Sequence, residues 1–227
     1  MAPWCRRLVA LAAIAAASAC GGGGSPTAPS VPQPPRTPAP GGPVMAPPPR
    51  GIDGRSISHE LWLVFFGCGG VSMCRAEAVH ANPPSAADRE LWERAAVAAA
   101  RYTDTSVDLA PGGPGATYSI SLVPGLTDED GTPAAASISP FTLPGGAEIK
   151  GGEISFEPAF LNDYTTVVKE LVRATGATGG DSPFPGLLSD SAVQAEPTPE
   201  EQFALRAAKN VPLGALCVRE DGVTPCK

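Results

Sequence analysis

The chain has 227 residues and a formal net charge of −7 at pH 7. An acidic balance argues against nucleic acid and anionic membrane surfaces as partners. After the N-terminal apolar run, no segment is apolar enough to be read as a membrane-spanning helix.

Residues 1–19 have the blocks of a bacterial export signal. Arg6 and Arg7 supply the positive charge, and an apolar run of about a dozen residues follows, short of the roughly 20 that span a bilayer. Small residues then lead into Cys20, with Ala17 where leucine is usual, and this stretch resembles the bacterial lipobox. The resemblance implies a lipid on Cys20. An ordinary secretory signal is the alternative.

Residues 20–54 are predicted to form a tether between this lipid and a domain. They are mostly Pro and Gly, a composition that cannot bury enough apolar surface to become ordered. At about 3.1 Å per residue, a Pro-rich segment of this length reaches up to about 90 Å. Residues 55–227 are predicted to form one globular domain. Without the signal the chain has 14 basic and 23 acidic residues, a net charge of −9.

Apolar patterns in the first part of the domain predict strands around one long helix. The apolar run 60–66 predicts a buried strand. Ser85 is predicted to cap a helix over 86–103, with Asp88 three residues further on. Further strands are predicted over residues 106–109, 117–123, 134–141 and 153–156.

Two helices are predicted in the second part. The first covers 163–175, has Val and Leu on one face, and ends at a cluster of glycines. The second starts at Thr198 as N-cap, with Pro199 in its first turn and Glu201 completing a capping box, and runs to about Lys209. This order of elements predicts an α+β fold with helices packed on one twisted sheet.

Four cysteines lie in the predicted domain, and in an exported protein they suggest two disulfides with three possible connectivities. The local pairs, Cys68 with Cys74 and Cys217 with Cys226, are favoured because each lies in a Gly-rich or turn-rich stretch. A zinc–cysteine site is the weaker alternative, because no C-x-x-C pair occurs.

The helix predicted over 163–175 contains K-E-L-V-R and reads K-E-L-V-R-A-T-G over 169–176. A loop with the sequence G-L-L-S at 186–189 follows, and then the helix capped at Thr198. This order resembles the catalytic half of a matrixin-like metzincin, a zinc peptidase with the helix motif H-E-x-x-H-x-x-G-x-x-H, a methionine turn and a C-terminal helix. The resemblance covers about 60–210. It implies a zincin-like twisted mixed sheet with a long N-terminal helix, a central former active-site helix and a C-terminal helix.

The resemblance places Lys169 and Arg173 at the first two zinc-ligand positions. The third falls on Gly179 or, with a two-residue insertion, on Asp181, and the methionine-turn position falls on Leu188. Zinc needs neutral imidazoles, thiolates or carboxylates, whereas Lys and Arg are cations without a lone pair near neutral pH. The sequence therefore predicts no metal ligands and no cofactor; zinc would be implied only if the motif were assigned wrongly.

Glu170 keeps the position of the general base, a vestigial catalytic residue when no metal activates a water. A salt bridge with a neighbouring Arg or Lys is its expected role. Lys169 and Arg173 are expected either on a solvated helix face or in a cationic patch that binds a carboxylate. His59 and His80 are expected on the surface or in loops.

Three functions remain open for this sequence. The first is a lipid-anchored pseudopeptidase that binds an extended peptide or protein along a sheet edge at 134–141. The second is a residual hydrolase in which Glu170 and Asp181 act as a metal-free acid/base pair. The third is a structural surface lipoprotein. In each case the lipid on Cys20 places the protein at the bacterial cell envelope, in the outer membrane or at the cell surface rather than in the inner membrane.

Overall fold

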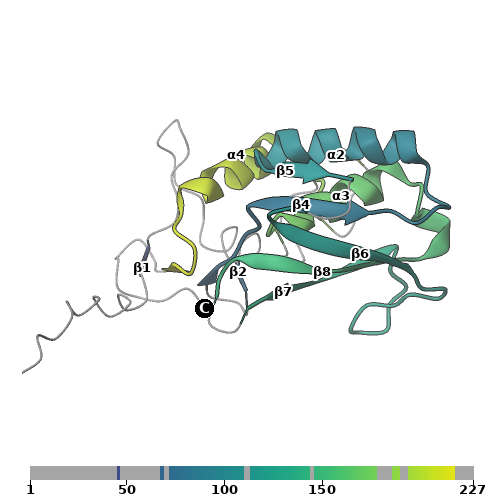
Figure 1. Cartoon of the computed structure of the whole chain (residues 1–227), viewed down its shortest axis with the longest axis horizontal. Coiled ribbons are helices and arrows are strands. Elements are labelled where there is room, and N and C mark those ends of the chain that lie inside the picture. The colour runs from purple at the N-terminus through teal and green to yellow at the C-terminus, as the bar shows by residue number, and fades with distance from the viewer. Residues whose placement is uncertain are drawn as a thin grey trace, which may run out of the picture. The chain divides into compact units, whose positions relative to one another are not determined.

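The computed structural model shows an α+β fold, with helices lying on a mixed β-sheet (Figure 1). It describes residues 45–46, 67–68, 72–109, 113–143, 146–177, 186–189 and 194–217. All of these belong to one compact unit, Pro40–Lys227. The predicted signal, Cys20 and the strand predicted over 60–66 lie outside the described residues.

The main sheet has five strands: β4 (Ala78–Asn82), β5 (Ser106–Asp108), β6 (Ala116–Leu122), β7 (Ala136–Thr142) and β8 (Ile149–Phe156). Their order across the sheet is β5-β4-β6-β8-β7. The first four are parallel to one another, and β7 is antiparallel to β8. The antiparallel strand therefore forms one edge of the sheet.

A second, smaller sheet joins the two ends of the described part of the chain. Its strands are β1 (Met45–Ala46), β2 (Gly67–Cys68), β3 (Ser72–Met73) and β9 (Leu216–Cys217), in the order β1-β9-β3-β2. Strand β1 lies inside the segment predicted as tether, and the boundary predicted at residue 54 stays a prediction. Backbone pairing with β9 needs no apolar pattern in β1, and two residues carry no such pattern.

The described helices are α2 (Arg89–Thr103), α3 (Tyr164–Ala174) and α4 (Pro199–Ala207), with short 3-10 turns η1 (Pro158–Phe160) and η2 (Ala208–Asn210). Helices α2 and α3 pack on each other and lie on the same face of the sheet (Figure 1). Helix α3 also packs against β4 and β7, and α2 against β5 and α4. None of the helices in the described part of the chain is long and apolar enough to cross a membrane.

Large aromatic side chains fix the helices over the sheet. The Trp92 ring of α2 packs edge-on against Phe156 of β8, with centroids 5.6 Å apart. Its indole Nε1 donates to the Leu161 carbonyl at 3.0 Å. The Tyr118 hydroxyl of β6 donates to the Ala174 carbonyl at the end of α3, also at 3.0 Å. Each ring is fully buried and has its polar atom satisfied, as a packed core requires.

The predicted start of the long helix is wrong by three residues. The N-cap is Asp88, whose carboxylate accepts from the Leu91 amide at 3.2 Å, and the helix begins at Arg89. The Asp88 amide in turn donates to Asn162 at 2.7 Å. This contact comes from far along the chain, so the sequence around Ser85 did not indicate it.

Two strands differ from their predictions. Strand β4 was missed because it is short and its sequence, AVHAN, has no clear apolar alternation. Strand β8 begins at Ile149 rather than at 153, since Gly151 and Gly152 interrupt its apolar pattern. A Cβ at Gly151 would overlap the Thr117 carbonyl oxygen, so the closely spaced backbones need these glycines.

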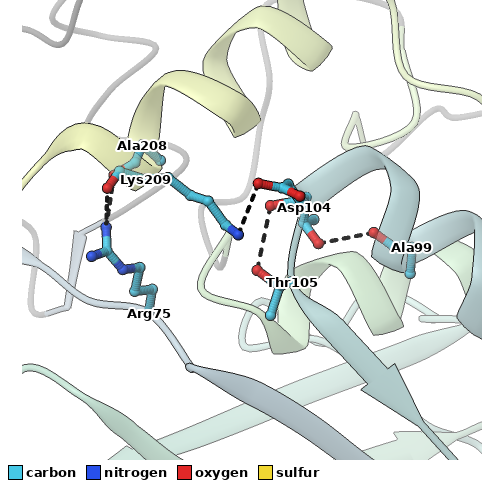
Figure 2. Close-up of polar contacts among 7 residues, drawn as sticks. Arg75, Ala99, Asp104, Thr105, Ala208 and Lys209 are labelled. Carbon is cyan, nitrogen blue, oxygen red and sulfur yellow. Dashed lines mark hydrogen bonds and ion pairs between the residues drawn. The ribbon is translucent and has the colours of Figure 1, made fainter.

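Two cations hold the end of α4 (Figure 2). The Arg75 guanidinium donates to the carbonyls of Ala208 at 2.9 Å, Lys209 at 3.1 Å and Val211 at 2.9 Å. Burial lowers the pKa of Arg75, and the nearby Glu77 carboxylate offsets part of that effect. The Lys209 ammonium donates to Asp104, just after α2, at 3.0 Å. The segment after α4 is therefore bonded both to Arg75, which precedes β4, and to Asp104, which follows α2.

Cys74 is disulfide-bonded. The described side chains include no cysteine other than Cys74, because those of Cys68 and Cys217 are not described and Cys226 lies outside the described residues. The partner of Cys74 therefore lies outside the described side chains. The predicted pairs, Cys68 with Cys74 and Cys217 with Cys226, therefore stay predictions.

Candidate functional site

Helix α3 carries the candidate site residues Lys169, Glu170 and Arg173. Asp163 caps its start by accepting from the Thr166 amide at 2.8 Å and from its hydroxyl at 2.7 Å. The predicted apolar face is buried against the sheet and α2. The helix ends at Ala174, one residue before the predicted end, with Thr175 as its C-cap. The φ of 126° at the following Gly176 and its close approach to the Cys74 carbonyl exclude a side chain there.

Glu170, which is buried, and Arg173, which is half-buried, form an ion pair on this helix. The Arg173 Nη1 atom lies 3.3 Å from Glu170 Oε1, and the two side chains are 16 % and 3 % exposed. The salt bridge expected for Glu170 is thus confirmed. The expectation that Arg173 lies on a solvated helix face is wrong, because the packing around α3 covers that face.

The pair is incompletely satisfied. Glu170 Oε2 and Arg173 Nε are buried, and neither has a hydrogen-bond partner in the structure as described. Leaving such an atom unpaired costs about 1–3 kcal/mol. The pair is therefore expected to contribute little net stability to the fold.

Lys169 reaches a different part of the site. Its ammonium donates to the Ser189 carbonyl at 2.8 Å, and its side chain is half-buried. With Lys169 bonded within the fold and Arg173 paired with Glu170, the cationic-patch hypothesis loses its support. Both cations serve intramolecular contacts.

The turn at 186–189 packs against the start of α4, and all four of its residues are buried. The amides of Leu187 and Leu188 donate to the two carboxylate oxygens of Glu201, each at 3.0 Å. Gly186 is required here because a Cβ would overlap that carboxylate. Leu188, at the predicted methionine-turn position, lies in the core.

Glu201 also completes the predicted capping box. Its amide donates to Thr198 Oγ1 at 3.2 Å, and its carboxylate accepts from the Thr198 amide at 2.8 Å. The prediction from T-P-E-E is therefore confirmed. The sequence did not indicate that the same carboxylate also binds two amides of the turn, because these donors are backbone groups fourteen and thirteen residues away.

The residues present do not fit the zinc ion that the resemblance implies. Lys169 and Arg173 are hydrogen-bond donors, and they occupy the first two ligand positions. Across the described ranges no three His, Cys, Asp or Glu side chains are grouped as a metal site would require. Both candidates for the third position, Gly179 and Asp181, lie outside these ranges.

The expectation that His80 is a surface or loop residue is wrong. It is buried on β4, with Nε2 3.2 Å from the Pro114 carbonyl oxygen and Nδ1 3.9 Å from Asp108. Its neighbours Val79 and Ala81 belong to the core, so the alternation of the strand places His80 on the sheet face away from α3. His59 lies outside the described residues.

Strand β7 borders the site and is the edge strand predicted near 134–141. The Glu157 amide donates to the Ala135 carbonyl at 3.0 Å, which fixes which residues bond inward. With that register, Ala136, Ile138 and Pro140 direct their backbone groups away from β8. Pro140 lacks an N–H and is tolerated because it stands at such an outward position.

No protein-family model, curated protein or solved structure matches this chain. The candidate site is therefore defined by its own contacts.

Proposed function

We propose that the protein is a lipid-anchored pseudopeptidase with a metzincin-like fold, which binds an extended peptide and cuts no bond. The order of its elements supports this proposal. The long helix α2 follows the first strand of the main sheet, and α3 follows β8, the last strand of that sheet. The buried turn and the helix α4 come after α3. The residues at the zinc-ligand positions of α3 make a metal-dependent mechanism incompatible with this site.

The observation that carries the proposal is the outer edge of β7. Ala136 and Ile138 present N–H and C=O groups there, and Pro140 presents a C=O, with no strand of the described chain paired to them. An extended peptide can pair with such an edge, and its backbone hydrogen bonds supply affinity without a metal. Because α3 packs against β7, the peptide would lie beside the former catalytic helix.

The state of Glu170 argues against the residual hydrolase. A general base must reach the proton that it removes. Here the carboxylate is buried, with one oxygen paired to Arg173. Asp181, the other carboxylate of the hydrolase hypothesis, lies outside the described residues.

The test is a selection of peptides from a random library on the full chain, followed by dissociation constants for two variants. Ala136→Pro removes one outward N–H, and Ala136→Val keeps it while adding a side chain of similar size. We expect Ala136→Pro to weaken binding up to about tenfold, the effect of one lost hydrogen bond, and Ala136→Val to bind as wild type does.

Equal affinities of the two variants, or a selection that yields no binder, would contradict peptide binding at this edge. Stoichiometric zinc in the purified chain, together with proteolysis that a chelator abolishes, would contradict the loss of the metal.

A further inference from the structure

The turn at 186–189 is held by a charged side chain on each side. Glu201 of α4 accepts from the amides of Leu187 and Leu188. Lys169 of α3 donates to the carbonyl of Ser189 at 2.8 Å. Two N–H groups of the turn thus face an anion and its last C=O faces a cation, and hydrogen bonds to charged groups of this kind are stronger than those between neutral groups.

We propose that Lys169 fastens α3 to this turn, a contact that we call the brace, so that the helix and the turn keep their arrangement without a metal ion. The proposal deepens the peptide-binding function and rests on it for the use to which this arrangement is put. The brace itself rests only on the contacts of Lys169, Ser189 and Glu201.

Lysine suits this position for physical reasons. Its four-carbon stem packs along the half-buried surface while its ammonium reaches a carbonyl twenty residues away. That carbonyl belongs to a buried residue, Ser189, and would otherwise lose a strong partner. Arg173, one turn further along α3, is engaged with Glu170 and does not make this contact.

Hydrogen exchange of the turn amides in the full chain tests the brace. Lys169→Met keeps the length of the stem and removes the donor, whereas Lys169→Arg keeps a cationic donor. Lys150→Met is the matched control, since Lys150 pairs with Glu148 on β8's start. We expect the amides of the turn to exchange roughly 10- to 100-fold faster in Lys169→Met, the effect of losing a charge-assisted hydrogen bond.

In the same experiment, Lys169→Arg is expected to stay within a few-fold of wild type, and Lys150→Met to leave the turn unchanged. Equal exchange in Lys169→Met and wild type, or equal acceleration in Lys169→Met and Lys169→Arg, overturns the brace. If Lys169→Met does not fold, Lys169→Gln takes its place, and exchange as slow as in Lys169→Arg then overturns the proposal.

Peptide binding measured on the same samples separates the two proposals. A faster-exchanging turn in a chain whose wild type binds no library peptide supports the brace and removes the peptide function. Peptide binding by wild type, with an unchanged turn in Lys169→Met, removes the brace and leaves the function.

Discussion

At the scale of single residues, helix α3 carries charged side chains that serve the fold. Glu170 and Arg173 bond to each other inside the protein, yet each retains one unpaired buried atom. Burying two charges costs several kcal/mol in desolvation, and their attraction repays this only with good geometry and complete hydrogen bonding. Here the hydrogen bonding is incomplete. We therefore expect the removal of one charge to lower the stability of the fold and the removal of both charges together to leave it nearly unchanged.

A double-mutant cycle tests this. Arg173→Met alone leaves the Glu170 carboxylate buried and unpaired, and we expect it to lower the free energy of unfolding by about 3 kcal/mol. The double variant with Glu170→Met is expected to return to within about 1 kcal/mol of wild type, because both charges are removed. Urea unfolding monitored by circular dichroism measures these values.

The surface pair Arg89 and Glu93 provides the control, with side chains 72 % and 55 % exposed. Arg89→Met is expected to change stability by less than about 0.5 kcal/mol, since water and salt screen that pair. A double variant of Glu170 and Arg173 that loses as much stability as Arg173→Met alone, or more, would show that the pair stabilises the fold.

At the scale of elements, Tyr118 links the middle of the sheet to the last turn of α3. Its hydroxyl is buried and bonded to the Ala174 carbonyl. Burial raises the pKa of this phenol above its ordinary value of 10.0. A carbonyl acceptor agrees with that direction, because it can bind only the protonated phenol.

The raised pKa predicts a loss of stability in alkali. Above about pH 10 the unfolded chain releases the Tyr118 proton and the folded chain keeps it, so unfolding becomes more favourable as the pH rises. The stabilisation is complete below that pH and is lost toward the folded pKa, at up to about 1.4 kcal/mol per pH unit.

We therefore expect the difference in unfolding free energy between wild type and Tyr118→Phe to shrink as the pH rises above about 10. Urea unfolding over an alkaline series measures it, and Tyr164→Phe, at a half-buried ring beneath Arg94, is the control for loss of a phenol. A constant difference across the series would mean that Tyr118 titrates in the folded protein as it does in the unfolded chain.

At the scale of the whole molecule, the proposed lipid on Cys20 would decide where the proposed peptide-binding edge acts. Replacing the cysteine removes the only proposed attachment to the membrane, since the acidic chain has no electrostatic attraction to anionic lipid. In a bacterial host, Cys20→Ser is expected to move most of the protein from the membrane fraction to the soluble fraction. Immunoblots of both fractions measure this.

Cys5→Ser is the matched control, because Cys5 lies in the predicted signal and is removed with it. Retention of Cys20→Ser in the membrane fraction at the wild-type level would contradict the lipobox assignment.

The sequence by itself determined the elements whose signals are local. Helix α4 was predicted from Thr198, Pro199 and Glu201, and α3 from its valines and the following glycine, since capping and amphipathic periodicity depend on neighbours in the chain. The chemistry of Lys169 and Arg173 was also readable from the sequence, because protonated Lys and Arg side chains donate hydrogen bonds and offer no lone pair to a metal. The salt bridge of Glu170 followed from its spacing of three residues from Arg173.

The tertiary structure alone decided what these residues contact. Nothing near Lys169 in the sequence indicates the Ser189 carbonyl, and nothing near Glu201 indicates the amides of the turn, because backbone groups look alike in every sequence. The burial of His80 and the bond from the Asp88 amide to Asn162 also depend on segments brought together only by folding. The sequence thus shows which side chains α3 and α4 carry, and the packing shows which backbone groups they contact, because those contacts form only when distant segments fold together.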